Sequence, residues 1–324
     1  MLLSSTVAAF IPTVLYIAII YWVDRYEKEP LWLLSAAFLW GAIPSVIVAL
    51  IFNGIFGVPF YLLLEEEAAN AAVASFIAPL VEESAKGLAL LGILYLWRTQ
   101  IDSILDGIIY GAMIGLGFAM IENIFYFMNT TSAEEFGFLV VMRAYVFGLN
   151  HSLFTAIIGI GIAVARLNRK NDTLKYVAPF LGWLGAVFVH FVHNASASLS
   201  TVLGPIACVP LFLNAWGGVL LLIVIVIWAL VQERRWIKTY LAKEVARETI
   251  GPQHYEVASS NLQRFTAAAS HLLSGNFSRF RQTRAFYDQC SRLAYACHHE
   301  ELYQDEEGRE LVADLRDWVI NNRI

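Results

Sequence analysis

The stretch Val81-Glu82-Glu83-Ser84-Ala85-Lys86 puts two carboxylates and an ammonium on one short segment of the chain. Apolar runs flank it on both sides, residues 76–80 before it and residues 88–91 after it. An ionisable side chain at the centre of a bilayer costs roughly 2.5–3.5 kcal/mol on insertion scales. Charges inside a membrane helix are therefore rare, and the default interpretation of such a cluster is a functional site.

The composition is that of a membrane protein with many spans. Of the 324 residues, 58% are hydrophobic and only 15% are charged, whereas a soluble domain carries about 25% charged residues. The net charge of −5 is small and the basic residues form no patch interleaved with aromatics, so the sequence predicts no nucleic-acid partner. The three cysteines form no C-x-x-C pair. Two of them, Cys290 and Cys297, are predicted to be buried structural thiols.

Apolar stretches long enough to cross a hydrocarbon core of ~30 Å occur at about seven places. They cover residues 2–23, 31–54, 69–97, 104–128, 138–165, 176–200 and 206–231. The first is interpreted as a retained transmembrane helix, because neither a basic n-region nor a cleavage site accompanies it. The predicted fold class is all-α: a polytopic transmembrane helix bundle over residues 1–231, embedded in the lipid bilayer, followed by a small helical region.

Lysine and arginine are distributed asymmetrically among the connecting loops. They follow the first, third, fifth and seventh spans, whereas the alternate loops 55–68, 129–137 and 201–205 contain none. Cytoplasmic loops carry the excess of Lys and Arg in membrane proteins. The pattern therefore predicts a multi-pass protein of the cell's inner (plasma) membrane, with its N-terminus outside and its C-terminal tail in the cytoplasm.

Residues 232–324 differ from the rest, because charge rises and continuous apolar runs stop. Helical periodicity covers residues 232–249, 259–273, 277–299 and 305–322. Gly251-Pro252 is predicted to break the first of these helices. No catalytic motif occurs here. The region is predicted to be a cytoplasmic helical tail, a candidate to bind a partner or to self-associate.

Three further spans carry polar side chains, namely Glu122 with Asn123, His151, and His190 with Asn194. A rise of ~1.5 Å per residue places Glu82, Glu83, His151 and His190 within a few Å of their span centres and Glu122 roughly 9 Å toward the outer face.

Glycines 107, 111 and 115 form a small-xxx-small face that predicts close approach of another helix. Arg143, in the outer part of its span, is expected to snorkel to the surface or to pair with the acidic outer loops.

This set of residues suits the activation of water. Histidine and carboxylate are standard ligands of Zn²⁺, which lowers the pKa of a bound water and polarises a carbonyl. A remaining glutamate can then act as general base. Without a metal, a single glutamate could activate the water while His and Asn stabilise the oxyanion. Lys86 lies four residues after Glu82, on the same helix face, and can pair with it.

At these residues the chain resembles the PrsW family of intramembrane proteases, within the larger group that includes the CAAX prenyl endopeptidases. The motifs are E-E-x-x-K at 82–86, F-x-x-x-E-N at 118–123, H-x-x-x-T at 151–155 and H-x-x-x-N at 190–194. The acidic and basic loop ending in Glu29-Pro30 and the position of Arg143 also fit. The resemblance covers about residues 20–200 and leaves the tail outside.

The resemblance implies a membrane-embedded endopeptidase, generally regarded as metal-dependent, that cuts membrane-anchored proteins such as anti-sigma factors. The predicted catalytic residues are Glu82, Glu83, Lys86, Glu122, His151, His190 and Asn194. Glu82 or Glu83 is the expected general base, and Lys86 and Asn194 are expected to orient groups or stabilise charge. The candidate ligands of a divalent metal, zinc in the simplest case, are His151, His190 and Glu122.

Two other functions use the same residues. Chains of Asp, Glu and His in membranes also serve as proton or cation pathways. No internal repeat or pair of broken helices is evident, which speaks against a transporter. The remaining alternative is a non-catalytic membrane scaffold or sensor, against which the complete set of polar groups argues.

Overall fold

The computed structural model describes residues 1–200 and 202–324, and within them it contains helices and connecting turns but no strand. The protein is thus an all-α polytopic bundle, as the sequence predicts. The chain divides into two compact units. The first comprises residues 1–23 and 29–226, and the second comprises residues 24–28 and 227–324.

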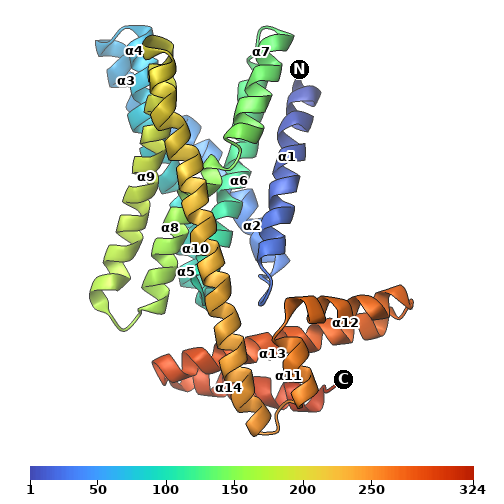
Figure 1. The fold of residues 1–324 in the computed structure, drawn as a ribbon. Helices are drawn as coiled ribbons and strands as arrows, with labels where there is room; N and C mark the ends of the chain where they lie inside the picture. The colour runs from blue at the N-terminus through green and yellow to red at the C-terminus, as the bar shows by residue number, and fades with distance from the viewer. The chain divides into compact units, whose positions relative to one another are not determined.

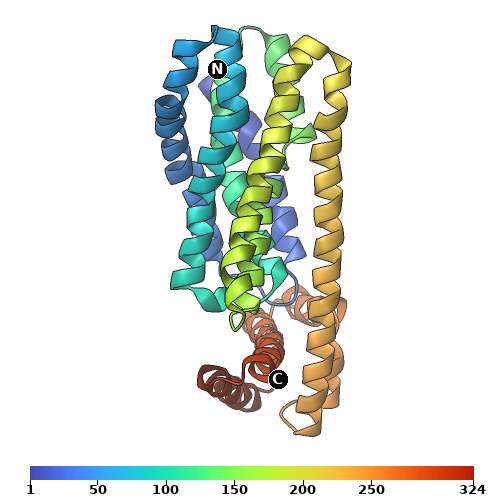
Figure 2. The ribbon, with the colours of Figure 1, turned by 90° about the vertical axis from the view of Figure 1, so that its left-hand side faces the viewer.

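The first unit is a bundle of long helices (Figure 1). In chain order its elements are α1 (Leu2–Val23), α2 (Leu31–Trp40), the π-helix η1 (Gly41–Ser45), α3 (Val46–Leu63), α4 (Glu66–Ala72), the π-helix η2 (Val73–Ile77), α5 (Ala78–Leu96), the 3₁₀ turn η3 (Arg98–Gln100), α6 (Ile104–Met128), α7 (Ala133–Leu139), the π-helix η4 (Val140–Val146), α8 (Asn150–Leu167), α9 (Asp172–Leu203) and the first half of α10 (Pro205–Ala246). A tight turn joins α9 to α10 (Figure 2). Gly204, at a positive φ of 62°, lies between the two helices in the sequence.

Six stretches of the described residues are long and apolar enough to cross a membrane: Leu2–Val23, Leu31–Leu63, Ile104–Met128, Ala133–Leu167, Asp172–Ser200 and Pro205–Ala246. They correspond to six of the seven spans predicted from the sequence. The seventh prediction, residues 69–97, falls on α4, η2 and α5, and α5 carries the three charges of the opening motif. These three charges exceed the two charged residues that an apolar window of the other six stretches contains at most, although the bundle buries them.

Two prolines accompany local changes of helical pitch. Pro44 lies inside η1, and Pro79 lies at the start of α5, directly after η2. Because proline lacks an N–H, the carbonyl four residues before it loses its helical partner. A wider π-turn is one way to accommodate this loss, and such turns are frequent at functional sites. The Asn194 side chain satisfies one carbonyl of η2, donating from Nδ2 to Ala74 O at 2.8 Å.

Helix α6 packs closely and antiparallel against α8. A Cβ atom on Gly107 would collide with the Gly159 carbonyl, one on Gly111 would lie 2.5 Å from the Thr155 carbonyl oxygen, and one on Gly115 would collide with the His151 backbone. The prediction of a close-packing glycine face is therefore confirmed. This contact sets the register of α6 against the helix that carries His151.

The second unit contains the end of α10 and the helices α11 (Pro252–Ala258), α12 (Asn261–Leu273), α13 (Phe277–Tyr303) and α14 (Glu306–Asn321). The structure ends α10 at Ala246 and adds the short helix α11, which the sequence pattern did not predict. A core of side chains from α10, α13 and α14 includes Leu241, Phe286 and Leu315.

The two cysteines of this unit are buried, as predicted. Burial raises the pKa of the Cys290 thiol to about 12 and that of the Cys297 thiol to about 11. Since the thiolate is the reactive form of cysteine, both thiols are protonated and unreactive near neutral pH. They act as small core residues, with Cys290 in the hydrophobic core.

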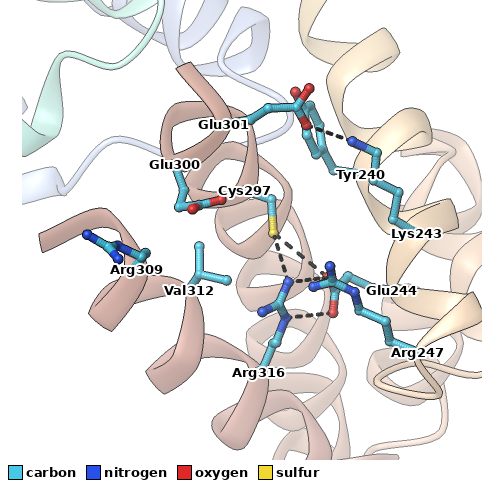
Figure 3. A pocket seen from close by; sticks show the side chains of 10 residues that line it. All are labelled: Tyr240, Lys243, Glu244, Arg247, Cys297, Glu300, Glu301, Arg309, Val312 and Arg316. Carbon is cyan, nitrogen blue, oxygen red and sulfur yellow. Dashed lines mark hydrogen bonds and ion pairs between the residues drawn. The ribbon is translucent and has the colours of Figure 1, made fainter. Parts of the chain in front are cut away.

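A buried carboxylate, Glu244, links α10 to α14 beside an open cavity of about 250 Å³ (Figure 3). Arg316 donates to both of its oxygens, at 2.7 Å from Nη2 and 3.0 Å from Nε. Thr249 Oγ1 donates to Oε2 at 2.7 Å. The Glu244 side chain is only 1% exposed, so it depends on these partners instead of water.

Replacing Arg316 by Ala removes two of these hydrogen bonds and should destabilise the second unit by about 2 kcal/mol. Amide hydrogen exchange of α13 and α14 in the full-length protein should then quicken by up to about 30-fold. Arg309→Ala is the matched control, because Arg309 lines the same cavity but is exposed and donates only to a backbone carbonyl. Equal exchange in both variants would contradict a stabilising role for the pair.

Candidate active site

The three charges of α5 lie together inside the bundle. Lys86 Nζ is 2.8 Å from Glu83 Oε1 and 3.6 Å from Glu82 Oε2. The side chains of Glu83 and Lys86 are 0% exposed. Helical spacing brings the ammonium back onto both carboxylates, because residues three and four apart share a face.

Helix α5 is fixed by two tryptophans on neighbouring helices. Trp40 Nε1 donates to the Ala85 carbonyl at 3.0 Å, and Trp183 Nε1 donates to Ser84 Oγ at 3.1 Å. Both contacts fall on residues between Glu83 and Lys86. They therefore hold the rotation of α5 at the point where its charges face the other helices.

Glu83 is fully engaged by three other side chains. Besides Lys86, His190 Nδ1 lies 3.0 Å from Oε1 and Thr155 Oγ1 donates to Oε2 at 3.1 Å. Since His190 belongs to α9 and Thr155 to α8, this carboxylate joins three helices. An arrangement with all its hydrogen bonds satisfied is rigid and suits a carboxylate that positions other groups.

His151 lies between Lys86 and a second ion pair. Its Nδ1 is 3.0 Å from Lys86 Nζ, and its Nε2 is 2.9 Å from Glu122 Oε2. Because an ammonium can only donate, Nδ1 accepts and the proton of this neutral imidazole lies on Nε2, facing Glu122. Glu122 also accepts from Arg143 Nη2 at 2.5 Å.

The partners predicted for Arg143 from the sequence were wrong. It neither snorkels nor pairs with the outer loops, but binds Glu122 and donates from Nε to Asn123 Oδ1 at 2.9 Å. Its guanidinium also lies 3.6 Å from the centroid of the Tyr126 ring. The available signal was the presence of Glu122 and Asn123 toward the same outer side of an adjacent span.

Aromatic rings cover these polar groups. Lys86 Nζ lies 3.8 Å from the centroid of the Phe118 ring, and the Phe154 ring stacks on His190 with centroids 4.6 Å apart. The rings of His151 and His190 themselves are 5.2 Å apart. Apolar walls exclude water and strengthen the electrostatic interactions of the enclosed groups.

One cluster has the composition of a metal site. Glu82, His151 and His190 each offer one ligand atom, and these atoms lie within 4.8 Å of one another. Glu82 Oε2 is buried and has no hydrogen-bond partner in the described part of the chain. A buried carboxylate oxygen without a hydrogen bond is unfavourable unless another group satisfies it.

Two further polar residues of α9, Asn194 of the H-x-x-x-N motif and the neighbouring His193, make other contacts. Asn194 donates to the backbone of η2 as described above. The Nδ1 atom of His193 lies 3.0 Å from the Nδ2 atom of Asn150. The structure therefore brings together Glu82, Glu83, Lys86, Glu122, His151 and His190, and gives Asn194 a contact with the segment that precedes α5.

Residues 29–234 match the PrsW family of intramembrane metalloproteases. The chain belongs to this family. Among PrsW proteins, the chain is 29% identical over 209 residues to protease PrsW of Oceanobacillus iheyensis, covering 63% of this chain and 89% of the relative. It is 31% identical over 194 residues to protease PrsW of Geobacillus kaustophilus, covering 60% of this chain and 78% of the relative. It is 32% identical over 180 residues to protease PrsW of Clostridioides difficile, covering 54% of this chain and 72% of the relative.

No solved structure matches the chain. The part that matches the PrsW family contains every side chain of the polar cluster and ends at residue 234. The protein is thus a multi-pass intramembrane peptidase of the PrsW family. Almost all of the second unit lies outside the match.

Proposed function

We propose that this chain hydrolyses a peptide bond of a membrane-anchored protein, with water activated by a divalent metal held in the bundle. The observation that carries the proposal is the convergence of Glu82, His151 and His190 inside an apolar enclosure. A single-span protein, of the kind that anti-sigma factors represent, is the expected substrate class, because the site is built from membrane helices.

The donor set fits a divalent ion such as zinc, which takes nitrogen and oxygen ligands. Among the described residues, Glu82 Oε2 accepts no hydrogen bond, and the Nδ1 atom of His190 faces Glu83, which leaves its Nε2 as the ligand atom. Ligating histidines usually donate their second N–H to a carboxylate, and both histidines here contact one. We therefore assign Glu82, His151 and His190 as ligands, which replaces Glu122 of the sequence-based ligand set by Glu82.

The charge balance also supports this assignment. Counted with every carboxylate ionised, the three carboxylates of Glu82, Glu83 and Glu122 face two cations, Lys86 and Arg143, which leaves one negative charge for a bound ion to balance. Lys86 contacts His151 Nδ1, so its ammonium must withdraw from that nitrogen when the ion binds. Glu83 offers Lys86 a closer partner, to which it can remain bound.

When bound, the ion would lower the pKa of a water molecule and polarise the scissile carbonyl. The residues of the chain then have separate tasks. Glu83 orients His190 and binds Lys86. Glu122 orients His151, and its ion pair with Arg143 fixes the position of the Glu122 carboxylate. Phe118 and Phe154 exclude bulk water from the cluster. Asn194 positions the segment that precedes α5.

If no metal is present, Glu82 is the general base of the same reaction, because its Oε2 lies buried in the cluster and accepts no hydrogen bond from the described part of the chain. The metal content of the protein separates this mechanism from the metal-dependent one.

The distribution of Lys and Arg supports an inner (plasma) membrane protein with its N-terminus outside and residues 232–324 in the cytoplasm.

Detergent-purified protein, prepared without chelators, should contain close to one equivalent of zinc by mass spectrometry. His190→Ala should lose the metal, because it removes one of three ligands. His193→Ala is the matched control, since His193 lies on the same helix but contacts Asn150. Equal metal in His190→Ala and wild type, or a metal-free wild type, would overturn the ligand assignment.

The hydrogen-bonded chain from Arg143 through Glu122, His151 and Lys86 to Glu83 also has the connectivity of a proton relay. This is the observation that favours the second candidate function. Proton flux in liposomes containing the purified protein, lost on Glu122→Gln, would support the relay. Flux no greater than in protein-free liposomes would exclude it.

A further inference from the structure

A long segment of the second unit carries only positive charge. Residues 257–287 contain four arginines and no aspartate or glutamate, in a chain whose net charge is −5. One of the four, Arg264, is used internally and pairs with Asp288 at 2.7 Å. Arg279, Arg281 and Arg284 are exposed on the first turns of α13 and form no ion pair in the described part of the chain.

Helix α12 lies on α13 as one arm of a helical hairpin (Figure 1). Its large apolar side chains face away from the unit. Leu262 is 72% exposed, Phe265 is 71% exposed and Leu273 is 89% exposed. Small residues take the inward positions, with Ala268 buried and Ala267 packed against the core. A helix of a soluble domain normally has the reverse arrangement, with its large apolar residues in the core.

The exposed side chains form one stripe together with the half-buried Ala269. Leu262, Phe265, Ala269 and Leu272 follow one another at intervals of three or four residues, and Leu273 adjoins the last of them. After the turn at Gly275, the stripe continues with Phe277, which is 64% exposed. The other large apolar residues exposed on α13 and α14 are single, and such isolated residues are ordinary. A continuous stripe marks an interaction surface.

We propose that the hairpin of α12 and α13 binds a bilayer surface that contains anionic phospholipids. The chemistry matches an interfacial helix, in which an apolar face enters the boundary between headgroups and acyl chains and basic residues contact the headgroups. The Arg residues of α13 supply the charge complementarity, since residues 257–287 contain no acidic side chain and Asp288, which follows them, is paired with Arg264. A protein partner of average surface composition would not require a segment free of acids.

Chain connectivity supports a lipid over a soluble partner. The helix α10 contains a membrane span and continues without interruption into the second unit. The hairpin is therefore tethered to a membrane protein in every molecule, and a tether raises the effective concentration of the surface to which it is attached. Even a weak interfacial helix would be bound under these conditions.

The test uses the full-length protein in vesicles, labelled with an environment-sensitive fluorophore at Leu273→Cys in a background where Cys208 is replaced by Ser. One set of vesicles is phosphatidylcholine alone, and the other has equal parts of phosphatidylcholine and phosphatidylglycerol. Nitroxide-bearing lipids should quench the label strongly in the second set. The same label at Ala313→Cys, on the exposed face of α14, is the matched control and should be quenched by aqueous iodide instead.

Replacing Arg279, Arg281 and Arg284 together by Gln should lower the docking equilibrium constant by about 10²-fold, since each arginine near an anionic surface contributes about one tenfold step or less. Lipid quenching at position 273 should fall accordingly, while thermal unfolding of the protein stays unchanged. Iodide quenching at 273 equal to that at 313 would overturn the proposal. So would a label at 273 shielded from both quenchers, because that result indicates a second copy or another protein on the stripe.

Discussion

Glu82→Gln should abolish proteolysis while leaving the bundle folded. Whether Glu82 binds the metal or acts as general base, the amide cannot replace its negative charge, and removing such a group costs on the order of 10²–10⁴-fold in rate. The isosteric amide keeps the shape of the buried side chain, whose Oε2 accepts no hydrogen bond from the part of the chain that the structure describes. The measurement compares membrane-protein fragments, identified by mass spectrometry of their new N-termini, in cells that produce wild type or variant.

Glu66→Gln is the matched control for this comparison. Glu66 is an exposed glutamate at the start of α4 and has no place in the cluster. It should release the same fragments as the wild type. A Glu82→Gln protein that retains more than about a tenth of the wild-type cleavage would contradict both roles of Glu82, because general acid–base groups contribute at least about 10²-fold.

Most of the bundle could be predicted because its segments obey simple rules. Apolar length alone identifies six spans, and the three glycines of α6 predict the close contact with α8. The second unit was harder to predict at its boundaries. Helix α11 is only seven residues long and begins at Pro252, so the Gly-Pro signal was interpreted as a break without the helix that follows it.

The members of the site could be predicted from type and depth, but their pairing could not. A buried charge in a membrane requires a partner, yet the sequence does not say which one. The prediction that Arg143 turns outward was wrong because η4 shifts the helical phase and α6 offers Glu122 as a half-buried partner. The depth estimate placed Glu122 away from the other polar groups. In the structure, however, Glu122 contacts His151 and therefore belongs to the cluster.

Gly111→Leu should prevent assembly of the bundle, and with it any activity. A Cβ at this position would lie 2.5 Å from the Thr155 carbonyl oxygen and 2.8 Å from Ala156 Cα, both backbone atoms that cannot turn away. Overpacking in a protein core costs about 1–3 kcal/mol, and a backbone collision lies at or above the upper end of this range. The thermal unfolding midpoint in detergent should fall by several degrees or the folded protein should be lost.

Gly92→Leu separates this collision from the general effect of adding a large side chain. No atom lies within 4 Å of a Cβ at Gly92, on the same helix as the two glutamates, so this variant should unfold at the wild-type temperature. We expect the Gly111 contact to affect activity as well, because the register of α6 on α8 brings Glu122 to within 2.9 Å of His151. A stable Gly111→Leu protein with full proteolysis would show that the site tolerates separation of these two helices.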